Sequence, residues 1–148
     1  MRFYEAWKLT SIAGNTTALG IQPPYGKSCI IHYASLTPAE FDVSDRRYYA
    51  AFRKTGEAYA FASTLTPSKY DSNDTASVVT VGPLSSPVYT SNTEIGYESY
   101  SQRRGWYFRG DPAKPFIISD YAQYGLYIYQ YTEPFLNTAI RIVYEELD

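Results

Sequence analysis

The feature that most constrains this chain is the alternation of side-chain character near its C-terminus. Residues 126–131 alternate aliphatic residues or glutamine with tyrosine. Residues 138–146 place Ile140, Ile142 and Tyr144 on one face and Ala139, Arg141, Val143 and Glu145 on the other. A period of two is that of a β-strand, whose successive side chains point to opposite faces. The connector between the two segments contains Pro134 and Asn137, which favour turns. We therefore predict an antiparallel hairpin with an aliphatic face inward and a half-exposed tyrosine face.

Further short strands are expected along the rest of the chain. The predicted strands are 2–10, 16–22, 28–34, 77–81, 106–109 and 116–119, and residues 66–75, 82–87 and 92–104 are predicted loops. Roughly eight to ten short strands separated by turns rich in glycine and proline favour an all-β antiparallel sandwich of jelly-roll type. The length suits a single β-sandwich domain over residues 1–148.

Residues 37–65 admit two interpretations. A threonine, a proline and a glutamate at the start of this region fit the cap and first turn of one short helix near 38–45. Beyond it, a helix over 45–56 competes with a hairpin that pairs 47–53 with 58–65. The second of these segments alternates at the strand period, so the hairpin is the preferred prediction.

Charge and hydropathy exclude several kinds of partner. The net charge is −2, from 13 basic and 15 acidic residues, which gives no electrostatic support for binding nucleic acid or an anionic membrane. No stretch approaches the roughly 20 apolar residues of a membrane helix. Residues 1–8 lack the apolar run of a signal peptide. We expect assembly in the cytoplasm, with no nucleic-acid or membrane partner.

Residues suited to catalysis or metal binding are few. Cys29 and His32 are the one thiol and the one imidazole, and on a strand this spacing puts them on opposite faces. Two such ligands do not close a zinc site, and the oxygen-rich segments 42–45 and 71–74 are more typical of loop turns than of calcium sites. No Gly-x-Ser-x-Gly or phosphate-binding glycine motif occurs. We expect no metal, no cofactor and no enzymatic activity. An enzyme that uses two carboxylates stays an alternative without a motif.

Two aromatic stretches are the candidate contact surfaces. The first interleaves arginine with aromatic residues, a combination typical of protein-interface hot spots. The second is a tyrosine stripe at strand period, for which cross-strand packing is the alternative explanation. The predicted partner-binding residues are Arg103, Arg104, Trp106, Arg109, Tyr127, Tyr129 and Tyr131.

The chain resembles, in style and over its whole length, the small β decoration or cement proteins and the tail or spike modules of tailed phages. The shared features are a high tyrosine content, here 17 residues, a near absence of cysteine, here one residue, and the lack of a signal peptide. This resemblance implies a non-enzymatic structural protein at a virion surface. It also implies a homo-oligomer, often a trimer, that binds its own copies and a major capsid or other assembly protein through an aromatic β surface.

A carbohydrate-binding, lectin-like module is the second hypothesis. Trp7, Trp106 or exposed tyrosines would then serve as stacking platforms. A glycan site requires one or two exposed rings beside Asp, Asn or Arg in a groove, whereas an assembly surface should be large, flat and aromatic. The arrangement of the aromatic side chains therefore distinguishes the two hypotheses.

Overall fold

Strands account for all the regular structure in the described part of the chain. The computed structural model of the 148-residue chain describes residues 2–12, 16–39, 47–55, 59–85, 94–101, 104–119, 121–129 and 136–147. Within these ranges the chain forms eleven strands and no helix. The strands are β1 Arg2–Ile12, β2 Thr16–Gln22, β3 Ser28–Pro38, β4 Arg47–Lys54, β5 Ser68–Lys69, β6 Thr80–Gly82, β7 Glu94–Ser101, β8 Trp106–Arg109, β9 Phe116–Ser119, β10 Tyr124–Tyr129 and β11 Leu136–Leu147.

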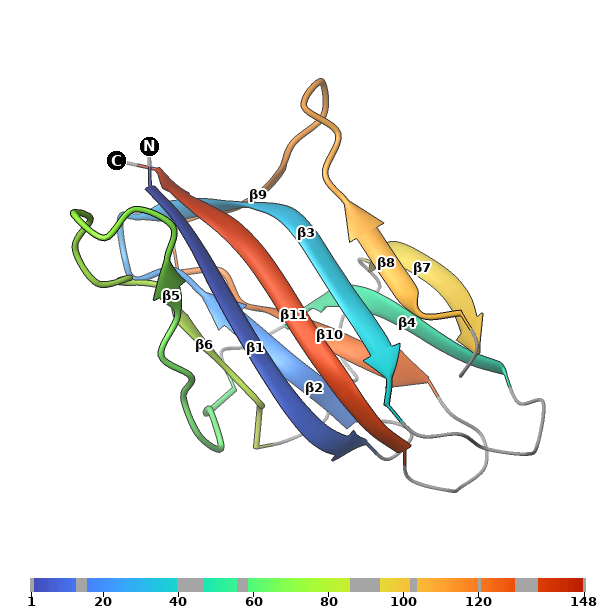
Figure 1. Ribbon diagram of the computed structural model, residues 1–148. Helices are drawn as coiled ribbons and strands as arrows, with labels where there is room; N and C mark the ends of the chain where they lie inside the picture. Colours follow the sequence, from blue (N-terminus) through green and yellow to red (C-terminus); the bar gives the residue numbers. More distant parts are fainter. Residues whose placement is uncertain are drawn as a thin grey trace.

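The strands form two antiparallel sheets that pack face to face (Figure 1). Sheet A has the order β5-β1-β11-β3-β8, with β9 also pairing with β3, and sheet B has the order β6-β2-β10-β4-β7. The pairs are nested along the chain: β4 with β7, β3 with β8 and β9, β2 with β10, and β1 with β11. Nested pairs distributed over two sheets are the jelly-roll arrangement, so the predicted fold class is confirmed.

The predicted C-terminal hairpin is wrong. Both of its segments are strands, but β10 lies in sheet B and β11 lies in sheet A. Each segment turns its aliphatic face toward the space between the sheets, where Leu126 and Ile140 are almost fully buried. The two strands thus face one another across the core instead of pairing edge to edge. Alternation specifies which face of a strand is buried, but it does not specify which other strand pairs with it.

Several further predictions along the chain need correction. The loop predicted over 66–75 contains β5, and the strand predicted over 77–81 is reduced to β6, which begins only at Thr80. Residues 47–53 form a strand as preferred, but β4 pairs with β10 and β7 and not with the described residues 59–65. Residues 92–104 were predicted as a loop, yet they contain β7, which is polar because it occupies the edge of sheet B. At the predicted helix near 38–45, β3 continues to Pro38, and 40–45 lie outside the described residues.

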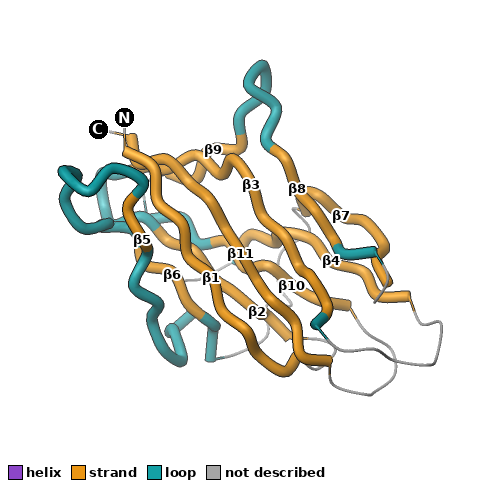
Figure 2. Tube along the Cα trace, in the orientation of Figure 1, coloured by secondary structure: helices purple, strands orange, loops and turns teal. Residues whose placement is uncertain are grey.

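The core between the sheets is strongly aromatic at one end. Phe52 lies edge-on to three other rings, with centroids 5.9 Å from Trp106, 5.6 Å from Phe108 and 5.4 Å from Phe116. These side chains join the aliphatic residues of both sheets in one cluster. The buried cluster therefore holds both sheets as one rigid support for their outer faces. Outside this core, the loop between β8 and β9, residues 110–115, protrudes beyond the sheets (Figure 2).

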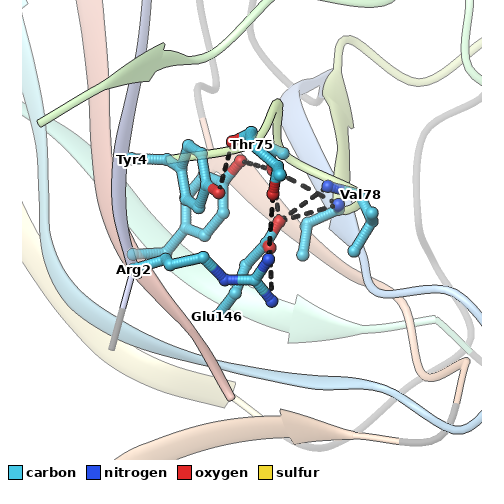
Figure 3. Close-up of polar contacts among 8 residues, drawn as sticks. Arg2, Tyr4, Thr75, Val78 and Glu146 are labelled. Atoms are coloured by element: carbon cyan, nitrogen blue, oxygen red, sulfur yellow. Dashed lines mark hydrogen bonds and ion pairs between the residues drawn. The ribbon is translucent and has the colours of Figure 1, made fainter. Parts of the chain in front are cut away.

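A buried carboxylate anchors the segment before β6 to β11, a central strand of sheet A (Figure 3). Glu146 of β11 is 3% exposed. Its Oε1 accepts hydrogen bonds from the Ser77 hydroxyl at 2.6 Å and from the Val78 N–H at 2.7 Å. The same oxygen accepts from the Val79 N–H at 3.2 Å, and the Arg2 guanidinium lies 3.7 Å from Oε2. One side chain thus satisfies several donors of a segment without regular structure.

Replacing Glu146 with alanine is expected to lower the free energy of unfolding by about 1–3 kcal/mol, because the partly buried amide of Val78 and the buried amide of Val79 both lose the carboxylate that accepts from them. Urea unfolding followed by circular dichroism measures the loss. The exposed Glu98→Ala serves as control and should change stability by less than about 0.5 kcal/mol. Equal losses for the two variants would contradict the anchoring role.

Candidate functional site

The outer face of sheet A carries a row of four side chains that crosses four strands. The strand register pairs Trp7 of β1 with Arg141 of β11. It also pairs Ser35 of β3 with Arg141 on one side and with Tyr107 of β8 on the other. Directly paired residues point to the same face, and three strand spacings place the Cα atoms of the two end residues about 14 Å apart. The row therefore has an aromatic ring at each end and polar groups between.

Both rings border an open groove. Trp7 is 63% exposed and Tyr107 is 49% exposed. The groove between them has a volume of about 480 Å³. Its lining residues are Glu5, Trp7, Tyr33, Ser35, Thr37, Tyr107, Ala139, Ile140 and Arg141. The groove thus combines two exposed rings with hydroxyl groups and a charged pair.

The charged pair in the groove is held by several hydrogen bonds. Arg141 donates from Nε to Oε1 of Glu5 and from Nη2 to Oε2 at 3.3 Å. The Tyr70 hydroxyl donates to the same Oε2 at 3.0 Å. The bond from Arg141 is the main reason that the pKa of Glu5 lies below its usual range, and it also raises the pKa of Arg141. Glu5 therefore remains an ionised acceptor into mildly acidic solution.

The Tyr33 ring orients two arginines beside the groove. The Arg141 guanidinium carbon lies 5.1 Å from the ring centre, and that of Arg109 lies 5.9 Å from it. Both distances fit cation–π contact. Arg141 is thus held from two sides, by the Glu5 carboxylate and by a tyrosine face, which limits the freedom that it would lose on binding a ligand.

Pairing of β5 with β1 holds Tyr70 beside the groove. Strand β5 pairs with β1 through Ser68 and Lys69, and the next residue, Tyr70, donates its N–H to the Phe3 carbonyl at 3.1 Å. Tyr70 is thereby positioned to donate its hydroxyl to the carboxylate in the groove.

The first predicted contact stretch divides between the inside and the outside of the sandwich. Trp106 is 1% exposed, and its Nε1 donates to the Gly96 carbonyl at 2.9 Å. The prediction that it contacts a partner is therefore wrong: on β8 it faces the core, and its neighbour Tyr107 faces outward. Arg104 and Arg109 are exposed. Arg103 lies outside the described residues.

The tyrosine stripe is largely explained by packing on the outer face of sheet B. Tyr127 is 2% exposed, so its predicted role as a contact residue is wrong. Tyr129 is half-buried and donates its hydroxyl to Glu94, and burial followed by this bond raises its pKa. The Arg53 guanidinium lies 5.2 Å from the Tyr127 ring centre and 5.7 Å from that of Tyr129. Tyr131 lies outside the described residues.

The thiol and the imidazole lie in different surroundings, as their spacing predicted. Cys29 is fully buried, and burial, with Glu146 as a second cause, raises the pKa of its thiol to about 12. His32 is half-exposed, with its ring 5.3 Å from that of Phe3 and its Nε2 3.5 Å from Glu145 Oε1. In the ranges that the structure describes, no three His, Cys, Asp or Glu side chains gather closely enough to hold a metal ion. The same ranges contain no helix with the length and hydrophobicity to cross a membrane.

Sequence reasoning named Trp7 as a stacking platform but missed three other residues of the groove. Glu5 carried a usable signal, because a charged residue in the middle of an otherwise apolar strand face marks that face as exposed. Tyr107 was missed because it was considered part of the same aromatic stretch as Trp106. Adjacent residues of a strand point in opposite directions, so the two side chains should have been considered separately. Arg141 had no local signal, because its importance comes from the strands on either side of it.

Comparisons with protein-family models, with curated proteins and with solved structures found no match. The chemistry of the groove itself therefore carries the functional interpretation.

Proposed function

We propose that this protein is a non-enzymatic carbohydrate-binding module whose ligand lies in the groove on the outer face of sheet A. The observation that carries the proposal is the pair of exposed rings, Trp7 and Tyr107, on either side of the Glu5–Arg141 pair. A sugar ring presents an apolar C–H face, which suits an aromatic surface. Its hydroxyl groups suit charged donors and acceptors that are already oriented. This is the arrangement that a glycan site requires.

The same geometry favours binding over hydrolysis. A glycosidase uses two carboxyl groups across the scissile bond, and the one that acts as general acid has a raised pKa. Glu5 is the one acidic residue among the described residues that line this groove, and its pKa is lowered. It is therefore suited to accept hydrogen bonds from hydroxyl groups.

The proposal predicts that glycans bind and change the emission of the exposed tryptophan. A glycan array probed with the full chain identifies the ligands, and fluorescence titration measures their affinity. Trp106 is buried, so a ligand-dependent change in tryptophan emission is expected to come from Trp7. An array without signal, or ligands whose binding leaves the emission unchanged, would contradict the proposal.

A structural role at a virion surface is the second proposal. The same face of sheet A exposes Leu9, at 56%, beside Trp7, and tryptophan, tyrosine and arginine are the residues enriched at interface hot spots. Jelly-roll domains occur in viral capsids as well as in lectins. A second copy or a capsid protein would then cover this face, and a stable interface needs about 800 Å² per partner.

Light scattering over a dilution series separates the two proposals. A stable small oligomer would support assembly through sheet A if the Leu9→Asp variant has only the mass of a monomer. A monomer at all concentrations that retains glycan binding would support the carbohydrate-binding module.

A further inference from the structure

A second hollow continues the groove beyond Tyr107. It has a volume of about 540 Å³. Its lining residues are Glu98, Ser99, Tyr100, Ser101, Arg104, Gly105 and Tyr107. Tyr107 lines both hollows and stands on β8, at the edge of sheet A. Strand β7 of sheet B lies beside β8 at this edge (Figure 1). The path therefore leads from the outer face of sheet A over its edge to the side of the sandwich.

The position of Tyr107 between the two hollows depends on the neighbouring glycine. A Cβ atom on Gly105 would lie 2.6 Å from the Leu36 carbonyl oxygen and 3.2 Å from the Tyr107 hydroxyl oxygen. The Tyr107 side chain therefore lies over Gly105, in the space that a side chain at position 105 would occupy. Its ring forms a boundary that a ligand in either hollow can contact.

The two hollows have the same balance of charge. The first contains Glu5 and Arg141, and the second contains Glu98 and Arg104. Among the described residues that line each hollow, one carboxylate and one guanidinium balance, so these residues give an anionic ligand no net Coulomb attraction. The other polar lining groups are mainly hydroxyls, which donate and accept hydrogen bonds. A neutral ligand rich in hydroxyl groups matches both hollows.

We infer that the ligand is a neutral oligosaccharide that spans both hollows across Tyr107. One part of the oligosaccharide lies between Trp7 and Tyr107, and its next sugar units lie beside Glu98 and Arg104. This inference rests on the proposed carbohydrate-binding function and adds the length and the charge of the ligand to it.

Calorimetric titration against chains of increasing length tests the inference. The probes are cello-, malto- and xylo-oligosaccharides from disaccharide to hexasaccharide, with oligogalacturonates as the acidic series. In the neutral series that binds, affinity should rise about tenfold as the chain extends into the second hollow, which corresponds to about 1.4 kcal/mol of added contact. Affinity should change little with salt, because the charges of the described lining residues balance in each hollow.

Arg104→Gln should remove the gain with length and leave disaccharide affinity within about twofold of the original. Lys114→Gln makes the same change of charge on the protruding loop 110–115, and it should leave the whole series unchanged. Equal affinity at every length, or an Arg104→Gln variant that keeps the gain, would overturn the inference. The proposed function survives that result if disaccharide binding still requires Trp7. Preferred binding of the acidic series would also overturn the inference, and no binding of any series would overturn both.

Discussion

Trp106→Ala is expected to lower the free energy of unfolding by about 3–5 kcal/mol, the usual cost of removing a large aromatic side chain from a core. The indole is 1% exposed and packs against Phe52 and Phe108 with ring centroids 5.9 and 6.5 Å away. The substitution also removes the hydrogen bond to the Gly96 carbonyl. Because the free energy of unfolding of a domain is typically about 5–15 kcal/mol, this single substitution removes a large part of the stability of the fold.

Urea unfolding followed by circular dichroism measures this effect. Trp106→Phe is the matched variant, because it keeps most of the ring and chiefly removes the hydrogen bond, which is worth about 1 kcal/mol. A loss below about 1 kcal/mol for the alanine variant would mean that the indole is not a core residue. The result also tests the interpretation made from sequence, in which Trp106 contacts a partner.

Trp7→Ala is expected to have the opposite effect. Affinity for the glycan should fall at least about tenfold, because the variant lacks the larger of the two rings that border the groove. Stability should change by less than about 0.5 kcal/mol, because the side chain is 63% exposed. Calorimetry with the bound disaccharide and urea unfolding of the same sample give the two quantities.

Leu9→Ala is the control for Trp7→Ala. Leu9 lies two residues further along β1 on the same face, is 56% exposed and does not line the groove. Its truncation should leave glycan affinity unchanged. If Trp7→Ala binds as tightly as the original protein, or loses binding only through unfolding, the groove is not the glycan site.

Local sequence pattern was sufficient for most strand positions. Strands β2, β8 and β9 have the predicted bounds, because each combines apolar or β-branched residues with glycine, proline or polar turn residues at its ends. Strand β7 was missed because an edge strand buries little and therefore shows no apolar alternation. The sequence did not show which of the two tryptophans is buried, because each lies among aromatic and basic residues. Only the position of each strand in its sheet defines which side faces the core.

The sequence by itself determined the all-β class and the alternating faces of most strands, because these follow from side-chain period and turn chemistry within a few residues. Only the tertiary structure decided that the two C-terminal strands belong to opposite sheets and that Trp7 is exposed and Trp106 buried. It also decided that Trp7, Ser35, Tyr107 and Arg141 stand in one row. Their strands are far apart in the chain, and which strands become neighbours depends on how two sheets bury their apolar faces together, a condition that no local pattern contains.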